Sequence, residues 1–102
     1  MVVYEVSVDV DAPIRADYLR WLKGHVAELL ALPGFTGCDV FEVIDPTGDE
    51  TLRVCMQYRL VDEAALAAYL RDHAPRLRAE GAERFGARMR AQRRVMRPLR
   101  FA

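Results

Sequence analysis

The chain contains two histidines, His25 and His73, and each falls in the middle of an apolar helical stripe rather than at its edge. An imidazole in a partly dry pocket can act as a general base, a proton shuttle or a metal ligand. The same position also suits a core histidine that is hydrogen-bonded to a neighbour. His73 is the stronger candidate for a catalytic residue, because Pro75 cannot donate a backbone hydrogen bond and so frees a carbonyl near it.

A second group of candidate residues is aromatic. By periodicity, these side chains point with His25 into the space between a sheet and its helices: Tyr4, Trp21, Tyr58 and Tyr69. Rings with polar tips beside an imidazole can line a pocket for a small, partly aromatic ligand. The alternative is an ordinary core whose tyrosine hydroxyls reach its rim, since a chain this short needs most of its aromatic residues for stability.

The cysteines give no sign of a metal site. Cys38 and Cys55 are 17 positions apart, with neither a CxxC motif nor a histidine-rich neighbourhood, so we expect two reduced thiols in strands. Arg53 and Arg59 flank Cys55 and are expected to lower its pKa, but neither histidine shares its face. Phosphate-binding glycine motifs, GxSxG and HExxH are all missing from the sequence. We therefore predict no metal and no cofactor.

The elements that carry these residues alternate between the period of a strand and that of a helix. The pattern predicts strands at 3–10, 36–44, 51–60 and 88–95, with a turn at 45–49. Helical stripes run from Tyr18 to Leu29 and, after a cap at Asp62, through Leu66, Tyr69, Leu70 and His73 to Leu77. Pro75 is expected to kink this second helix after Asp72 or His73. Gly81 and Gly86 are candidate ends for it.

The resulting order is β-α-β-β-α-β, the ferredoxin-like α+β fold, in which two helices cover one face of a four-stranded antiparallel sheet. An internal echo agrees with this order. Residues 21–29 and 69–77 share an aromatic residue, a leucine, a basic residue, a histidine and a second leucine at an offset of 48. The length predicts one domain, residues 1–102.

Charge is balanced overall but unevenly distributed. Residues 1–51 hold 3 basic and 10 acidic side chains, whereas residues 52–102 hold 12 and 5. The predicted topology places the acids of the first strand between arginines of the third and fourth strands, so that much of the imbalance cancels across the sheet.

RNA-binding versions of this fold stack bases on aromatic residues of the first and third strands, whereas this chain has Glu5, Ser7 and Asp9 at such positions. Nucleic-acid binding is therefore disfavoured.

The compartment is expected to be the cytoplasm. The first residues, Met-Val-Val-Tyr-Glu-Val, match a strand rather than a signal peptide, and no apolar run is long enough for a membrane helix.

The run from Pro33-Gly34-Phe35 through the hairpin, with residues 65–75 and Phe85-Gly86, resembles small bacterial members of the dimeric α/β-barrel superfamily, which includes antibiotic-biosynthesis-type monooxygenases. The whole chain is most similar to a small bacterial family of unknown function. In that superfamily two ferredoxin-like units pair through their open sheet faces, and ligand cavities lie between each sheet and its helices. The resemblance therefore implies a homodimer with a small-molecule site, and it specifies the fold better than the reaction.

Three functional expectations follow. The first is a small-molecule-binding barrel, with a cofactor-independent monooxygenase or isomerase that uses His73 as one form of it. The second is a non-catalytic regulatory dimer. The third is haem binding, because haem-binding relatives place a histidine on the corresponding second helix. Those relatives also use an asparagine from the first strand and a tryptophan from the third, whereas this chain has no asparagine and its one tryptophan, Trp21, is in the first helix. Haem degradation is therefore disfavoured.

Overall fold

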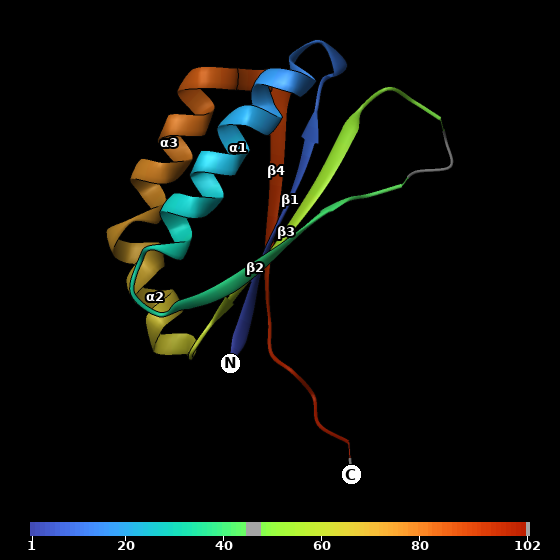
Figure 1. The fold of residues 1–102 in the computed structure, drawn as a ribbon. Coiled ribbons are helices and arrows are strands. Elements are labelled where there is room, and N and C mark those ends of the chain that lie inside the picture. Colours follow the sequence, from blue (N-terminus) through green and yellow to red (C-terminus); the bar gives the residue numbers. More distant parts are fainter. Residues whose placement is uncertain (45–47, 102) are drawn as a thin grey trace.

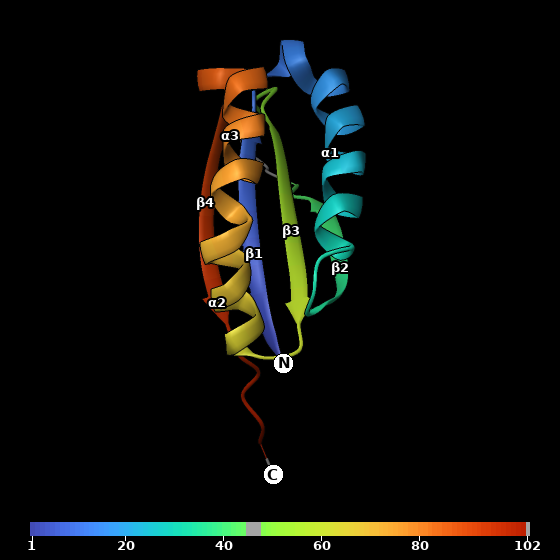
Figure 2. The ribbon, with the colours of Figure 1, turned by 90° about the vertical axis from the view of Figure 1, so that its left-hand side faces the viewer.

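A computed structural model describes residues 1–44 and 48–101. Its helices and strands are β1 (Val2–Val10), α1 (Arg15–Leu30), β2 (Phe35–Glu42), β3 (Leu52–Leu60), α2 (Glu63–Asp72), α3 (Ala74–Phe85) and β4 (Met89–Met96), with single 3-10 turns at Ala12–Ile14 and Gly86–Arg88. In these described residues the strands form one antiparallel sheet in the order β2-β3-β1-β4. The helices cover one face of that sheet and leave the other open (Figure 1, Figure 2). The ferredoxin-like α+β fold expected from the sequence is confirmed.

Strict alternation explains the central strands. β1 pairs with β3 over its whole length, so that Tyr4 lies opposite Tyr58 and Val8 opposite Val54. The helix-facing side chains of both strands are buried, as their period of two predicts: Val2, Tyr4, Val6, Val8 and Val10 on β1, and Leu52, Val54, Met56, Tyr58 and Leu60 on β3. These side chains and the apolar stripes of the helices make up the core.

The chain passes from α1 to β2 through a turn that needs glycine. Gly34 has a φ of +89°, in the left-handed region, and a Cβ added there would lie 2.5 Å from the Cβ of Ala65 on α2. The predicted hairpin joins β2 to β3, and residues 45–47 of its turn lie outside the described residues.

The second predicted helix is divided at His73 into α2 and α3, which confirms the expected kink. Asp62 caps α2 by accepting a hydrogen bond from the backbone N–H of Ala65 at 2.8 Å. His73 leaves the helical path with φ of −127°, and Pro75 occupies the first turn of α3, where its missing N–H costs nothing. The backbone N–H of His73 still donates to Tyr69, and the carbonyl of His73 accepts from Leu77.

Two expectations for this helix are wrong. Of its two candidate ends, Gly86 is confirmed as the C-cap of α3, whereas Gly81 does not end the helix but lies buried inside it, where a Cβ would come within 3.2 Å of both Trp21 and Met89. The sequence pattern places Leu70 on the buried stripe, whereas 37% of it is exposed. α2 packs on the sheet through Leu66 and Tyr69 and ends two residues after Leu70, so that Leu70 lies at the margin of the contact.

The open face of the sheet carries the charge pairing that the topology predicts. Glu5 is 5% exposed and accepts hydrogen bonds from Arg94 on β4 and from the Gln57 side chain on β3, the latter at 3.0 Å. The Arg94 guanidinium, with Gln57, holds the pKa of Glu5 below its usual range. Asp9 lies 3.8 Å from Arg53. Acid on the middle strand is therefore balanced by arginine on both neighbours.

After Met96 the chain continues as an extended segment that leaves the body of the fold (Figure 1). No helix in the described residues is both long enough and apolar enough to cross a membrane.

Candidate functional site

A cavity of about 50 Å³ lies between the sheet and its helices. Strand residues of its lining come from β1, β3 and β4, and helical residues from α1, α2 and α3: Tyr4, Val6, Val8, Tyr18, Trp21, His25, Leu29, Met56, Tyr58, Tyr69, Leu77, Arg78, Gly81, Met89, Ala91 and Arg93. It has room for several water molecules or for the end of a small organic molecule.

Among the described residues, His25 provides the one imidazole on the lining of the cavity. Its ring stacks on that of Trp21, one helical turn earlier on α1, with centroids 4.4 Å apart and an angle of 19° between the planes. Burial lowers the pKa of His25, and the nearby carboxylates of Glu28 and Glu80 oppose this shift without reversing it. In the described residues, the buried Nδ1 atom of His25 has no hydrogen-bond partner. The imidazole is therefore neutral at physiological pH and has a free polar atom.

Tyr58 provides a second free polar atom. This side chain is 1% exposed, and within the described part of the chain its hydroxyl has no hydrogen-bond partner. Burial strongly raises its pKa, so the hydroxyl keeps its proton. Buried polar groups are normally paired, and a phenol left alone in an apolar core costs free energy. A ligand or an ordered water in the cavity would satisfy it.

Two further tyrosines, Tyr4 and Tyr69, form the wall beside Tyr58. Tyr4 packs between Tyr58 and Tyr69, with ring centroids at 6.1 and 5.7 Å. Its hydroxyl accepts a hydrogen bond of 2.9 Å from Arg78 on α3. Burial raises the pKa of Tyr69 to about 12, so that this phenol also remains protonated. The wall is thus aromatic, neutral and rich in hydroxyl groups.

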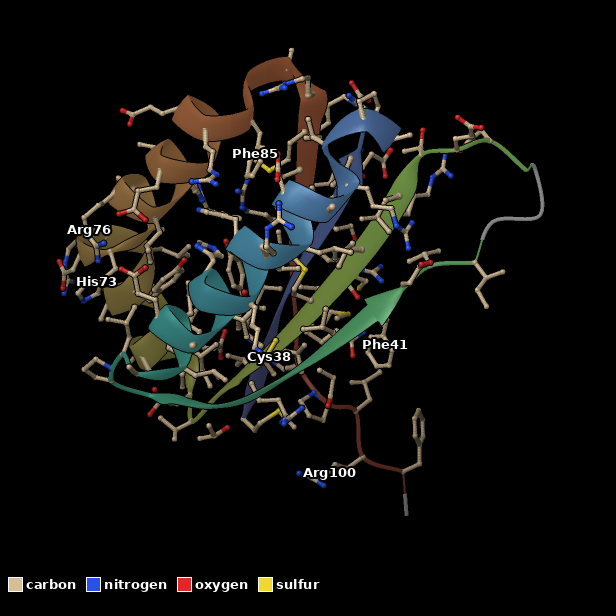
Figure 3. All side chains as sticks on the ribbon, turned by 45° about the horizontal axis from the view of Figure 1, so that its top comes forward. Cys38, Phe41, His73, Arg76, Phe85 and Arg100 are labelled. Atoms are coloured by element: carbon tan, nitrogen blue, oxygen red, sulfur yellow. The ribbon has the colours of Figure 1, made fainter. Side chains whose placement is uncertain are left out.

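The structure brings together five of the six residues singled out in the sequence. Tyr4, Trp21, His25, Tyr58 and Tyr69 all line this one cavity. His73 does not line it, because it occupies the junction of α2 and α3. Figure 3 shows His73 beside Arg76 on the outer side of the helical layer. The cavity therefore lies beside His25 and not beside the histidine that the sequence favours.

Arg78 and Arg93 are lining residues that the sequence reasoning missed. A signal for Arg93 exists, because alternation along β4 puts it on the same side as Met89 and Ala91. Pairing with β1 then turns that side toward the helices, since Arg93 lies opposite Val6. Because residues 84–100 contain seven arginines, and those of β4 lie on both of its faces, the alternation of apolar and charged side chains is weak there.

The cysteines are not activated nucleophiles. Burial raises the pKa of the Cys38 thiol to about 11. Burial and the hydrogen bond to Glu5 also raise the pKa of Cys55, so the lowering expected from its arginine neighbours is wrong. Within residues 1–44 and 48–101, no group of three or more His, Cys, Asp or Glu side chains is placed to hold a metal ion.

The cavity does not fit a haem. A porphyrin needs a pocket of several hundred Å³, as drug-sized ligands do, whereas this cavity measures about 50 Å³. His73, the residue that the resemblance assigns to iron, is not on its lining, and the His25 ring is stacked against Trp21.

A second depression, of about 290 Å³, lies where the amino terminus meets the segment after β4. Its lining includes the ion pair of Arg97 and Glu63, at 2.7 Å, together with Asp62 and Arg100. The Arg97 guanidinium there is already paired with Glu63, so it is less available to a ligand. The central cavity is therefore the better candidate site.

The strand order and the helices on one face of the sheet define a ferredoxin-like α+β protein. The chain belongs to the domain-of-unknown-function family DUF4286, whose model matches residues 1–99. No curated protein matches it in sequence.

Solved structures with this fold are distant in sequence. SnoaB, a cofactor-independent oxygenase from Streptomyces nogalater solved as a mutant, is 16% identical over 98% of this chain and 95% of its own, with a TM-score of 0.70. A mutant of MhuD, with two manganese protoporphyrin IX molecules bound per active site, is 16% identical over 100% of this chain and 98% of its own, also with a TM-score of 0.70. A dimeric ferredoxin-like protein from an uncultured marine organism is 12% identical over 98% of this chain and 97% of its own, with a TM-score of 0.65. At these identities the likeness establishes the fold alone.

Proposed function

We propose that this protein binds a small organic molecule in the cavity between its sheet and its helices. The observation that carries the proposal is the pair of buried, unpartnered polar atoms, Nδ1 of His25 and the hydroxyl of Tyr58, which belong to two residues that line one aromatic cavity in the described part of the chain. A ligand with one polar group and a flat apolar body satisfies such a site at little cost, because the walls are already in place.

Trp21 makes the proposal testable without a known ligand. It is the one tryptophan of the sequence and lines the cavity, so its fluorescence reports occupancy directly. Titration with short carboxylates and single-ring aromatic compounds is expected to change Trp21 emission in a saturable way.

A cavity-filling pair of variants locates the binding site. Ala91→Leu adds three carbons to a residue on the lining, and Ala82→Leu adds the same atoms to an exposed position on α3. Binding is expected to weaken by about tenfold or more in the first variant and to stay unchanged in the second. Gly81→Ala fills less space and serves as a second test, since its Cβ would meet Trp21 at 3.2 Å. Equal binding in all three variants contradicts the proposal.

If the bound molecule is also transformed, His25 is the base that the cavity supports. A neutral imidazole can take a proton from a C–H bond next to a ketone, and the Tyr58 hydroxyl can donate to the oxyanion that forms. This step needs no oxidant, which favours an isomerase-like reaction over an oxygenase. In this proposal His25 takes the role that the sequence gives to His73, because His25 lines the cavity.

The proton-transfer role is tested by following deuterium incorporation into 4-oxopentanoate by NMR. The wild-type protein is expected to speed exchange of the C–H bonds beside the ketone above the buffer rate, with the proton passing to the imidazole and deuterium returning from it. His25→Gln should abolish this acceleration, whereas His73→Gln should keep it. If the wild type does not speed exchange, the protein binds its ligand without catalysis. If only the His73 variant loses the acceleration, His73 and not His25 is the base.

We also propose a homodimer formed through the open face of the sheet. Phe41 on β2 supports it, because Phe41 is 49% exposed and lies opposite Cys55, on the side away from the helices. A second copy would cover this ring together with the paired charges around Glu5. Sedimentation should then give twice the 11.6 kDa of one chain.

The dimer has a matched control in the adjacent residue. Val40 is 48% exposed but lies opposite the buried Met56, on the helix side of β2. Phe41→Glu is expected to give monomers and Val40→Glu to leave the dimer intact. A wild-type protein that sediments as a monomer contradicts this part of the proposal.

We propose the cytoplasm as the compartment, in keeping with Cys38 and Cys55, which are both free thiols.

A further inference from the structure

The cavity carries an uncompensated positive charge. Arg93 lies on its lining and, in the part of the chain that the structure describes, makes no hydrogen bond or ion pair. Three arginines close to it in the chain are held by acids: Arg90 by Asp11, Arg94 by Glu5 and Arg97 by Glu63. Arg93 is exposed at the edge of the cavity, and its charge adds to the lowering of the His25 pKa by burial and opposes the upward pKa shift of Tyr69. Arg93 is thus the one member of this group that faces the cavity.

The rest of the lining adds a second cation and no acid. Arg78 lines the cavity and donates to the hydroxyl of Tyr4, and no aspartate or glutamate is among the described lining residues. Glu28 and Glu80 are the carboxylates that act on the pKa of His25. Both are bound by Arg76, at 2.9 and 3.2 Å, and this single guanidinium offsets half of their combined negative charge. The charged side chains on the lining, Arg78 and Arg93, are therefore both cations, while most of the other lining residues are apolar or aromatic.

We propose that the ligand of this cavity is a short planar carboxylate, bound with its anionic group at Arg93 and its apolar body between the aromatic walls. This inference rests on the proposed small-molecule function and adds the charge and size of the ligand. A guanidinium free of other partners can bind a carboxylate through two parallel hydrogen bonds. The unpartnered hydroxyl of Tyr58 then suits an acceptor, such as a carbonyl, on the same ligand.

The volume of the cavity limits the size of this ligand. A dry cavity of about 150 Å³ accommodates benzene, whereas the volume here is about 50 Å³. An unsaturated acid of four or five carbons fits best. A single ring requires Trp21 or Met89 to move, which is feasible because both are only partly buried. Fused ring systems are excluded by the same comparison.

The test uses crotonate as the probe, crotonamide as its uncharged counterpart, and benzoate and 2-naphthoate to vary size. Trp21 fluorescence and two-dimensional amide NMR are followed in low-salt buffer, where charge interactions are least screened. We expect crotonate to bind about tenfold or more tightly than crotonamide, because a charge-assisted pair is stronger than a neutral one. Benzoate should bind more weakly than crotonate, and 2-naphthoate should not bind.

Two variants on the same strand assign the preference to Arg93. Arg93→Gln removes the charge that faces the cavity, whereas Arg90→Gln removes an equal charge on the opposite face of β4. Arg93→Gln is expected to erase the difference between crotonate and crotonamide without changing crotonamide binding, and Arg93→Lys should restore part of it. Arg90→Gln should behave as the wild type.

The outcomes separate this inference from the function on which it rests. Equal affinity for acid and amide, with both shifting cavity residues, overturns the carboxylate preference and leaves small-molecule binding intact. A preference for crotonate that survives in Arg93→Gln also overturns it, because the anion is then bound elsewhere. Failure of every compound to perturb Trp21 or the neighbouring amides overturns both.

Discussion

The rings of Trp21 and His25 stack at 4.4 Å, one turn apart on α1, and form one wall of the central cavity. The stack covers the imidazole from water on one side and so contributes to the burial that lowers its pKa. It also places the one tryptophan of the chain in contact with the titratable group of the site.

The buried imidazole of His25 should make folding stability depend on pH. Its pKa is lowered in the folded state from an ordinary value of 6.5, so the unfolded chain binds more protons in the interval between the two values. The free energy of unfolding is therefore expected to rise as pH increases toward 6.5 and then to level off. Urea titrations of the wild type and of His25→Gln, at several pH values, measure this. A wild-type slope that the substitution leaves unchanged contradicts the assignment.

The carboxylate of Glu5 should also make the free energy of unfolding rise with pH, although its pKa is lowered by hydrogen bonds and not by burial. Arg94 and Gln57 lower its pKa from 4.5, so its contribution is present above that pH and is lost as the carboxylate is protonated in more acid solution. Glu5→Gln is expected to cost about 1 kcal/mol at neutral pH, a modest value because Arg94 is 68% exposed. Thermal unfolding at pH 7 and at pH 3 tests this, since the difference between wild type and variant should shrink in acid.

Two glycine substitutions should change stability in opposite directions. Gly24 lies on the exposed side of α1 with open space around it, so Gly24→Ala is expected to stabilise the protein by about 0.5–1 kcal/mol through helix propensity. Gly34→Ala combines a strained φ of +89° with a 2.5 Å clash against Ala65, and it is expected to destabilise by more than about 1 kcal/mol. Melting temperatures that move in the same direction for both would contradict this account of the α1–β2 turn.

Removing the imidazole of His73 should leave the cavity unaffected. His73→Gln is expected to change stability slightly, because the side chain lies at the junction of α2 and α3, and to keep crotonate affinity within about twofold. Trp21 fluorescence titrations of this variant and of His25→Gln make the comparison. A large loss of binding in the His73 variant would show that the junction governs the site.

The fold was predictable because its signals are local and repeated. Strict alternation in β1 and β3 predicts which side chains are buried, and Pro75 predicts the break between α2 and α3. Five of the aromatic and histidine residues that line the cavity, Tyr4, Trp21, His25, Tyr58 and Tyr69, follow from the same periodicity. Residue type alone, however, cannot tell which of two histidines on similar stripes faces inward. The break that Pro75 causes turns His73 out of the stripe, whereas the uninterrupted α1 keeps His25 on the cavity.

Arg93 shows a different limit of sequence reasoning. Seven arginines lie between residues 84 and 100, and their composition indicates a basic surface. Only the register of β4 against β1 separates Arg90 and Arg94, which face the open side, from Arg93, which faces the helices. A shift of one residue would exchange these faces, and the apolar side chains of Met89 and Ala91, on the same side as Arg93, are only a weak local signal against it. The charge of the cavity therefore required the structure.

The most direct test of the central claim is a set of intermolecular nuclear Overhauser effects between crotonate and the protein. Small-molecule binding in the central cavity predicts contacts from the crotonate methyl protons to the ring protons of Tyr58, Tyr69 and Trp21, all of which line it. These contacts should disappear in Ala91→Leu and persist in Ala82→Leu. Contacts confined to the second depression, near Arg97 and Arg100, would contradict the account, and so would contacts to the cavity that persist when Ala91→Leu fills it.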